Sequence, residues 1–189
     1  MVERALVRGI FFTGRNASSP NRIAVILALV VAVLLSTPIS GEVEAGELHA
    51  LINGKAAHLD TIPGTTFNEN NWGGGIQYDF DPWNDDWIPF LNVSGFSDSN
   101  SNPSYYAGGG LMRRFILSEE LDNLHVDLGA VAFLMTRKGY RNNRPFFGGL
   151  PVASIGTDRI AINVTYIPKV DPKMVQLLFF QLKIKILEF

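Results

Sequence analysis

Beyond residue 46 the sequence consists of short segments rich in β-branched and aromatic residues, separated by clusters of Gly, Pro, Asn, Asp and Ser. Segments bounded in this way are typical of β-strands. They fall at about 48–58, 72–80, 87–97, 105–117, 124–136, 147–156, 160–167 and 174–186. Most are near the roughly 9–11 residues that a tilted strand needs to cross a bilayer. Because their number is even, an antiparallel sheet of them can close with both termini at one end. The sequence therefore predicts an all-β fold, an eight-stranded antiparallel transmembrane β-barrel.

Alternation within the predicted strands indicates two different faces. The apolar face of 124–136 contains Val126, Leu128, Ala130, Ala132 and Leu134, and the other face contains His125, Asp127, Gly129 and Val131. Aromatic residues gather near strand ends, as in an interfacial girdle; these are Trp72, Trp83, Trp87, Phe90, Tyr105, Tyr106, Phe146, Phe147 and Tyr166. The alternative is a soluble periplasmic barrel or sandwich, which the girdle disfavours. If the final strand continued to Phe189, Lys183 and Lys185 would lie on the same face as this aromatic residue, and Glu188 would break the alternation. We therefore expect the last three residues to lie outside the final strand.

The connections predict how the barrel is oriented. Polar and mostly long linkers follow the odd-numbered strands, at 59–71, 100–104, 137–146 and 168–173. Tighter linkers follow the even-numbered strands, at 81–86, 118–123 and 157–159. Outer-membrane barrels have long external loops and short periplasmic turns. We therefore expect a periplasmic N-terminus and odd-numbered strands that run outward.

The first 45 residues have the pattern of a secretory signal. Four arginines precede an apolar run at 23–35, whose length of about 13 residues is short of the roughly 20 that span a bilayer. We expect a signal peptide over 1–45, cleaved near 41–45, and a mature barrel over 46–189. A signal anchor that stays attached is the alternative.

Composition excludes several classes of function. The chain has no cysteine, so disulfides and thiolate metal sites are ruled out. Its net charge is −2 and its Lys and Arg residues are scattered, which argues against a nucleic-acid surface. The sequence contains neither a nucleotide-binding glycine loop nor a His-Glu-x-x-His motif. We therefore expect no cofactor and no metal.

Four segments in chain order, 67–80, 95–110, 124–137 and 150–168, resemble the lipid A palmitoyltransferases of the PagP type. The closest pieces are Asn-Glu-x-x-Trp-Gly-Gly-Gly, the pair Asp98-Ser99, and Leu-Pro-x-Ala-Ser-x-Gly followed by Thr-Tyr-Ile-Pro. The resemblance implies an outer-membrane barrel that moves a palmitoyl chain from a phospholipid to lipid A. These two lipids are then its partners, and we expect a monomer.

The resemblance also implies which residues form the site. Asp98 and Ser99 match the family's pair, and Gly110 matches the glycine that closes its acyl pocket. Of the three histidines, His58 ends the first predicted strand at the same rim as Asp98 and Ser99. His49 lies nine residues earlier, roughly 30 Å down the strand at about 3.3 Å per residue. We expect His58 to hold the family's position, and His49 is the alternative.

For an acyl transfer, we expect each of these residues to have a distinct role. His58 would act as general base, because free imidazole titrates near neutrality, with Asp98 orienting the ring and Ser99 polarising the ester carbonyl. Gly108 and Gly110 would leave room for an alkyl chain. Arg141 and Arg144 would bind lipid A phosphates, or simply contact the anionic leaflet. The competing hypotheses are a non-enzymatic barrel with a structural, adhesive or protective role and, less favoured, a lipid A deacylase.

Overall fold

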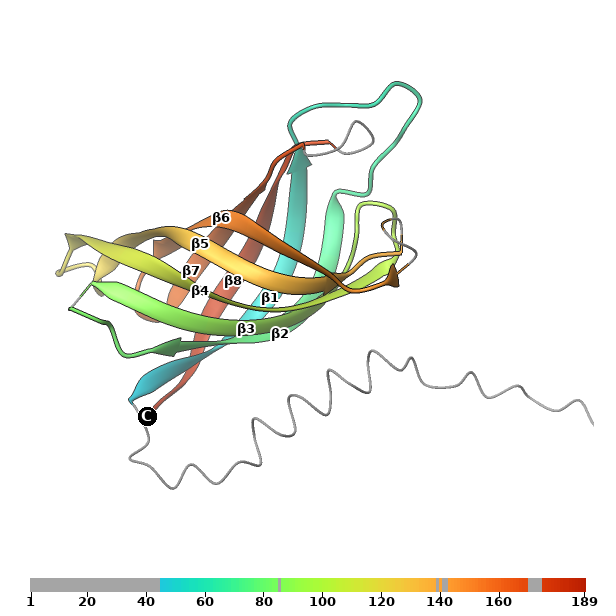
Figure 1. The fold of residues 1–189 in the computed structure, drawn as a ribbon. Coiled ribbons are helices and arrows are strands. Elements are labelled where there is room, and N and C mark those ends of the chain that lie inside the picture. Colours follow the sequence, from blue (N-terminus) through green and yellow to red (C-terminus); the bar gives the residue numbers. More distant parts are fainter. Residues whose placement is uncertain (1–44, 85, 139, 141–142, 170–174) are drawn as a thin grey trace, which may run out of the picture. The chain divides into compact units, whose positions relative to one another are not determined.

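Figure 1 shows the computed structural model, which describes residues 45–84, 86–138, 140, 143–169 and 175–189. The strands are β1 (Gly46–His58), β2 (Asn70–Phe80), β3 (Trp87–Ser97), β4 (Pro103–Ser118), β5 (Leu124–Thr136), β6 (Phe146–Gly156), β7 (Ile160–Ile167) and β8 (Leu177–Glu188). Each strand pairs antiparallel with the next, and β8 pairs with β1, so the sheet closes into a barrel. The predicted all-β, eight-stranded antiparallel barrel is confirmed.

The predicted signal peptide, 1–45, lies outside the described residues except for Ala45. Within the described part of the chain, no helix has the length and apolar character needed to cross a membrane.

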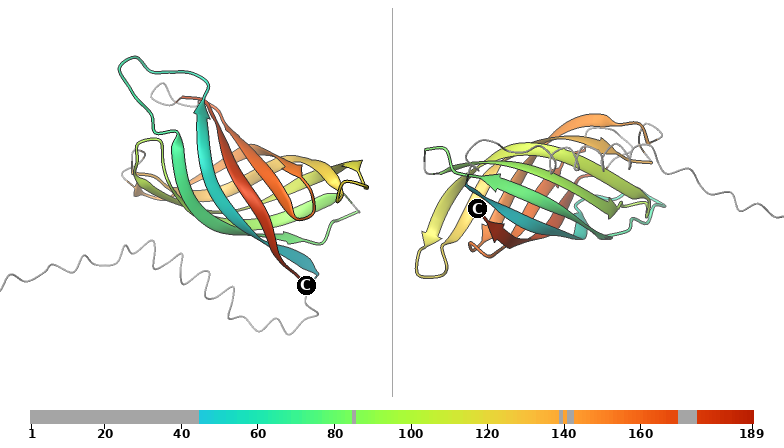
Figure 2. Two further views of the ribbon diagram at one scale, coloured as in Figure 1. Left: turned by 180° about the vertical axis from the view of Figure 1, so that it is seen from behind. Right: turned by 90° about the horizontal axis from the view of Figure 1, so that it is seen from below.

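The two ends of the barrel differ. The first and last strands begin and finish side by side, as both views in Figure 2 show. We call this the terminal end, and we call the opposite end, where β1, β3, β5 and β7 finish, the loop end. The connections at the loop end span 59–69, 98–102, 137–145 and 168–176, whereas those at the terminal end span 81–86, 119–123 and 157–159. The predicted asymmetry holds for every connection except the short 98–102.

The bounds of β3, β5 and β7 are those expected from the sequence, whereas β8 differs. It continues through Leu187 and Glu188, so the expectation that these residues lie outside the strand was wrong. An irregularity in the pairing with β1, between Leu48 and His49, allows the ladder to continue to this point.

The barrel is polar inside and apolar outside. In β5, His125 and Asp127 are buried while Leu128 and Leu134 are exposed, which confirms the two predicted faces. The outward side chains of other strands are also large and apolar; they include Ile52, Ile76, Leu91, Phe115, Ile155, Ile160 and Ile162. An apolar exterior of this extent is typical of a surface that contacts lipid.

The aromatic residues divide between the exterior and the interior. Trp72, Trp83 and Phe147 are exposed, as a girdle requires. Phe90 and Tyr106 were wrongly expected in that girdle: Phe90 is 3% exposed, and the Tyr106 hydroxyl accepts a hydrogen bond from Gln181 across the barrel. In a strand, the parity of a residue decides its face, and both residues have inward parity.

Apolar and polar groups form separate zones in the interior. Phe90, Met112, Val131 and Val152 pack together on β3–β6, with Phe133 and Leu150 against them. A second cluster, Ala56, Leu177 and Phe179, contacts Phe96 and Ile167. Elsewhere in the lumen, Gln181 donates to Asn53 Oδ1 (2.6 Å), and Asn53 donates to Ser94 Oγ (2.7 Å).

Ion pairs fill the terminal half of the lumen. Lys183 Nζ lies 3.0 Å from Asp79 Oδ2, and Lys185 Nζ lies 2.9 Å from Glu47 Oε1. Their inward direction explains why these lysines interrupt the apolar pattern of β8.

The ladder between β6 and β7 is short. It pairs Val152–Gly156 with Ala161–Thr165, and Phe146–Pro151 of β6 lie beyond it. Pro151 is the first residue of β6 beyond the paired stretch, and proline has no N–H to donate to a ladder. In Figure 1 the loop-end half of β6 diverges from β7 accordingly.

Candidate active site at the loop end

His58 is the last residue of β1, and its side chain is only 5% exposed. Its Nε2 lies 3.2 Å from Ser99 Oγ, although the two residues are 41 positions apart. The ring of Phe67 stacks on the imidazole, with centroids 4.7 Å apart and an interplanar angle of 17°. The structure thus brings together two of the predicted site residues and holds the imidazole plane in place.

Asp98 is 1% exposed and organises the turn that carries Ser99. Its Oδ1 accepts hydrogen bonds from the backbone N–H groups of Asn100 and Asn102, both at 2.9 Å. Its Oδ2 lies 3.2 Å from Arg137 Nε and accepts a hydrogen bond from Ser104 Oγ at 3.4 Å. These groups occupy both oxygens, and in the described part of the chain no ion pair joins Asp98 to His58. The contacts of Asp98 hold the turn that carries Ser99, and its expected role in orienting the imidazole stays a prediction that no direct contact with His58 supports.

The main chain also holds Ser99 in place. Its carbonyl accepts a hydrogen bond from Asn68 N at 2.8 Å, and the Asn68 side chain donates to the carbonyl of Asp98 at 3.2 Å. The connection 59–69 is thereby tied to the turn after β3. Because that connection also carries Phe67, the same segment fixes both the ring of His58 and the hydroxyl of Ser99.

Glu69 is a neighbour of His58 that the sequence reasoning missed. Its Oε1 lies 3.8 Å from His58 Nδ1, on the side of the ring away from Ser99. The signal was present in the Asn-Glu-x-x-Trp-Gly-Gly-Gly run, where Glu69 is the acidic residue. An isolated exposed glutamate just before a strand offered no other reason to select it.

The other two histidines lie at the terminal end. His49 Nε2 is 3.1 Å from Asp79 Oδ2 and 3.3 Å from Glu47 Oε2. His125 Nδ1 is 2.6 Å from the carbonyl of Asn123. His49 is therefore embedded in the ion pairs of the lumen, and the structure places His58, not His49, beside Ser99.

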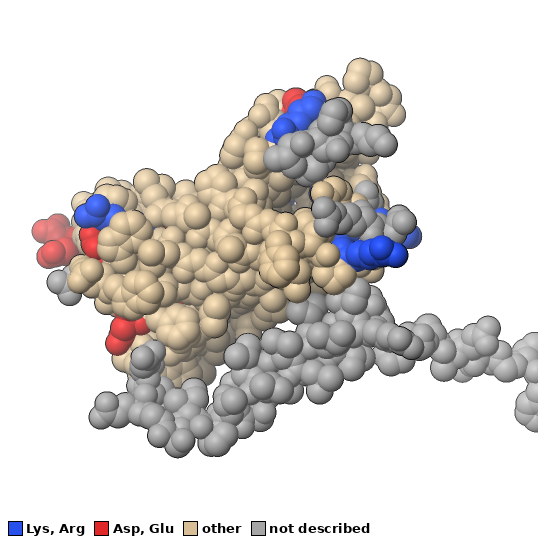
Figure 3. All heavy atoms as spheres, in the orientation of Figure 1, with Lys and Arg blue, Asp and Glu red and all other residues tan. Residues whose placement is uncertain are grey.

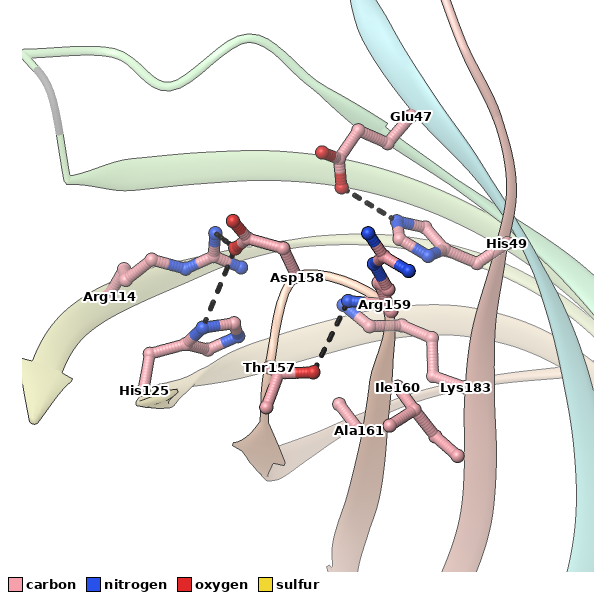
Figure 4. A pocket seen from close by; sticks show the side chains of 10 residues that line it. All are labelled: Glu47, His49, Arg114, His125, Thr157, Asp158, Arg159, Ile160, Ala161 and Lys183. Atoms are coloured by element: carbon pink, nitrogen blue, oxygen red, sulfur yellow. Dashed lines mark hydrogen bonds and ion pairs between the residues drawn. The ribbon is translucent and has the colours of Figure 1, made fainter. Parts of the chain in front are cut away.

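Glu47, His49 and Asp79 present ligand-type atoms within 4.8 Å of one another. A metal ion there would have to displace the ammonium groups of Lys183 and Lys185, which lie within 3.0 Å of the two carboxylates. These lysines already balance the negative charge, so the donor set fits an internal salt-bridge network better than a cation site. Figure 4 shows the side chains that line the shallow hollow beside this network, with His49 and His125 on different sides of it.

Gly108 and Gly110 lie on the inward face of β4. A Cβ atom added at Gly110 would lie 2.5 Å from the ring of Phe90, its pairing partner on β3. A Cβ atom added at Gly108 would lie 3.0 Å from Phe133 Cβ and 3.1 Å from Asn92 Oδ1. The two glycines therefore permit close packing within the apolar cluster, and the Phe90 ring covers Gly110 on its lumen side.

Of the two arginines expected to bind phosphate, Arg141 lies outside the described residues, and Arg144 is exposed just before β6. Figure 3 shows basic residues at the loop end of the barrel, and acidic residues are prominent at the opposite end of the same face. The Nε of Arg137 is paired with Asp98 at 3.2 Å, so this nitrogen holds the turn after β3.

Comparisons with known proteins point to one family. A family model described as "Antimicrobial peptide resistance and lipid A acylation protein PagP" matches residues 58–182. The lipid A acyltransferases PagP of Bordetella pertussis (strain Tohama I) and Methylobacillus flagellatus are each 31% identical to the chain, over 103 and 105 residues. Each match covers 54% of this chain and 54% of the relative, so the chain spans about half the length of the curated relatives it matches.

Among solved structures, the attachment invasion locus protein Ail of Yersinia pestis aligns over 77% of this chain and 97% of that chain. The sequence identity is 15% and the TM-score is 0.44, a likeness too low to bear on fold or function.

Proposed function

Because the chain belongs to the PagP family, we propose that it is an outer-membrane acyltransferase that moves a palmitoyl-type chain from a phospholipid to lipid A. The observation that carries the proposal is the contact between His58 Nε2 and Ser99 Oγ at the loop end. The contact places an imidazole that can accept the proton of a substrate hydroxyl beside a serine hydroxyl that can polarise the ester carbonyl, and acyl transfer to lipid A uses both groups.

The proposed reaction exchanges one acyl–oxygen bond for another and moves one proton through His58. A lipid A hydroxyl attacks the ester carbonyl of the phospholipid while His58 Nε2 accepts its proton. A new acyl–oxygen bond forms, the old one breaks, and the imidazolium returns the proton to the departing glycerol oxygen. The Ser99 hydroxyl donates a hydrogen bond to the carbonyl oxygen, where negative charge develops. Asp98 and Arg137 hold the turn that aims this hydroxyl.

The barrel wall supports entry of a lipid from the bilayer. The apolar exterior supports a location in a membrane, and the predicted signal peptide and the loop asymmetry support the outer membrane. The β6–β7 ladder pairs only Val152–Gly156 of β6, so no backbone hydrogen bonds of that ladder close the wall beside Leu150. Leu150 packs on the apolar cluster of Phe90 and Val131. An alkyl chain that enters there would meet apolar side chains within the lumen.

The apolar cluster around Phe90 and the charged layer beyond Met112 set the limits of the acyl site. The chain would lie beside Gly108 and end near Gly110, where the Phe90 ring stands. Beyond Met112, Arg114 forms two hydrogen bonds to Asp127, at 3.0 and 3.1 Å, and a charged layer of this kind excludes hydrocarbon. Arg144 and Arg141 would bind lipid A phosphates at the rim. Closure of the sheet leaves no exposed strand edge between β1 and β8, which fits a monomer.

The test is mass spectrometry of lipid A from cells that express the chain, its His58→Ala and Ser99→Ala variants, and Ser101→Ala as a matched control. Ser101 lies in the same turn as Ser99 and is exposed. We expect the wild type and Ser101→Ala to add one long acyl chain, His58→Ala to add none, and Ser99→Ala to be strongly impaired. Unchanged lipid A in cells whose outer membrane contains the folded wild-type barrel would refute the proposal and favour the non-enzymatic barrel.

A further inference from the structure

His58 carries a second ring nitrogen whose function is not explained by the contact with Ser99. Nδ1 is buried and has no hydrogen-bond partner within normal distance among the residues that the structure describes. The nearest acceptor assigned to it is Glu69 Oε1, 3.8 Å away. An unpaired buried N–H destabilises the folded state, so a carboxylate facing this nitrogen lies where it can remove that cost.

The backbone around Glu69 is fixed, which leaves its side chain as the adjustable part. The Glu69 carbonyl accepts a hydrogen bond from Ala56 N at 2.9 Å, two residues before His58 on β1. Phe67 fixes the imidazole plane from the same connection. The side chain of Glu69 is 47% exposed, so a small rotation can shorten the 3.8 Å separation without disturbing packing.

The two carboxylate oxygens of Glu69 face different partners. Oε1 faces His58, whereas Oε2 lies 3.7 Å from Lys55 Nζ. Lys55 is 64% exposed, and an exposed ion pair of this kind contributes little free energy. The lysine therefore does not compete for the oxygen that faces the imidazole, and it provides a control that alters only the other oxygen.

We propose that Glu69 is the residue that positions His58, completing a carboxylate–imidazole–hydroxyl line of Glu69, His58 and Ser99. Its Oε1 accepts the Nδ1–H of His58, which leaves Nε2 unprotonated and directed toward Ser99 and the substrate hydroxyl. When Nε2 takes the proton of that hydroxyl, the carboxylate stabilises the imidazolium without itself becoming protonated. The inference rests on the proposed acyltransferase function for its catalytic consequence but not for the geometry.

Asp98 does not fill this role because its oxygens bind Arg137, Ser104 and the backbone of its own turn. The two acidic residues thus have different roles: Asp98 positions the Ser99 hydroxyl, and Glu69 positions the His58 imidazole.

The experiment compares Glu69→Ala, Glu69→Gln and Lys55→Ala in the full-length barrel, in detergent micelles that contain phospholipid and lipid A. We expect kcat to fall about 10- to 100-fold in Glu69→Ala at unchanged KM, less than the ~10⁴-fold loss when a fully buried orienting carboxylate is replaced. Glu69→Gln, which can still accept the Nδ1–H but lacks the charge, should fall between Glu69→Ala and wild type. Lys55→Ala should match wild type. Equal kcat in Glu69→Ala and Lys55→Ala would overturn the proposal.

A second measurement is independent of turnover. With three histidines in the chain, the ¹⁵N resonances of His58 can be assigned by comparison with His58→Asn. We expect the Nδ1–H tautomer of His58 to dominate in wild type and Lys55→Ala, and to be lost in Glu69→Ala. If the wild type does not acylate lipid A, the proposed function fails and this spectrum alone decides the role of Glu69; an identical spectrum in Glu69→Ala refutes it.

Discussion

Replacing Asp127 with alanine removes the fully buried partner of the Arg114–Asp127 ion pair in the lumen. Asp127 is fully buried and receives two hydrogen bonds from Arg114, at 3.0 and 3.1 Å. Removing one member of a buried pair costs about 3–5 kcal/mol, because the other charge stays in the interior. The Arg114 side chain is 21% exposed, and its Nη1 lies 3.8 Å from Oδ1 of a second carboxylate, Asp158. We therefore expect a loss of about 2–3 kcal/mol, or roughly 30- to 150-fold in the unfolding equilibrium constant.

The neighbouring pair on the same strand provides the control. Arg113 Nε lies 2.8 Å from Asp86 Oδ2, but it points outward and is 49% exposed. Exposed pairs contribute about 0–1 kcal/mol, so Asp86→Ala should change stability little. The assay is equilibrium denaturation of the barrel in lipid vesicles, followed by the fluorescence of its three tryptophans and by heat-modified migration on gels.

A double variant separates the free energy that the ion pair contributes from the cost of the unpaired Arg114 charge that Asp127→Ala leaves in the lumen. Replacing Arg114 with methionine together with Asp127→Leu removes both charges, and we expect stability within about 1 kcal/mol of wild type. If Asp127→Ala destabilises no more than Asp86→Ala, then water or neighbouring side chains already compensate the lumen charges, and the reasoning is wrong.

Three further substitutions, with one outward-facing control, probe the lumen by the same denaturation assay. Gly110→Ala places a methyl group against Phe90 and should cost about 1–3 kcal/mol, whereas Gly109→Ala, on the outward face, should cost less; equal losses would contradict the packing. Phe90→Ala should cost about 3–5 kcal/mol by opening a cavity, and a loss below 1 kcal/mol would show that the cluster collapses or fills with lipid. Gln181→Leu leaves buried partners such as Asn53 unpaired and should cost about 1–3 kcal/mol; a neutral result would mean that water replaces the amide.

The fold could be predicted largely from the sequence because its determinants are local. Turn residues delimit the strands, and the alternation of β5 assigns Leu128 outward and Asp127 inward without knowledge of any partner strand. Phe90 and Tyr106 were nevertheless assigned to the exterior, because aromatic type was weighed above the alternation rule, which places both inside. The chain end was misjudged because the inward lysines of β8 resemble an interruption when their partners are unknown.

The candidate site could be predicted only in part. Asp98, Ser99 and His58 were selected from the resemblance and from the rule that odd-numbered strands finish at one rim, and the structure places His58 beside Ser99. The separate tasks of Asp98 and Glu69 were not foreseen, because they depend on the path of the 59–69 connection and on the turn after β3. Both are held by hydrogen bonds between segments distant in sequence, such as Asn68 N to the carbonyl of Ser99.

The sequence by itself thus determined the number of strands, their order and the alternation of inward and outward faces along them. These properties follow from a period of two residues and from turn chemistry, which act within a few positions of the chain. Only the tertiary structure decided which side chains meet: Lys183 with Asp79 and His49 with Asp79 and Glu47 in the lumen, and Glu69 with His58 at the loop end. Those contacts depend on the stagger of strands around a closed barrel and on the irregularities in β1, and both are fixed only when the last strand pairs with the first.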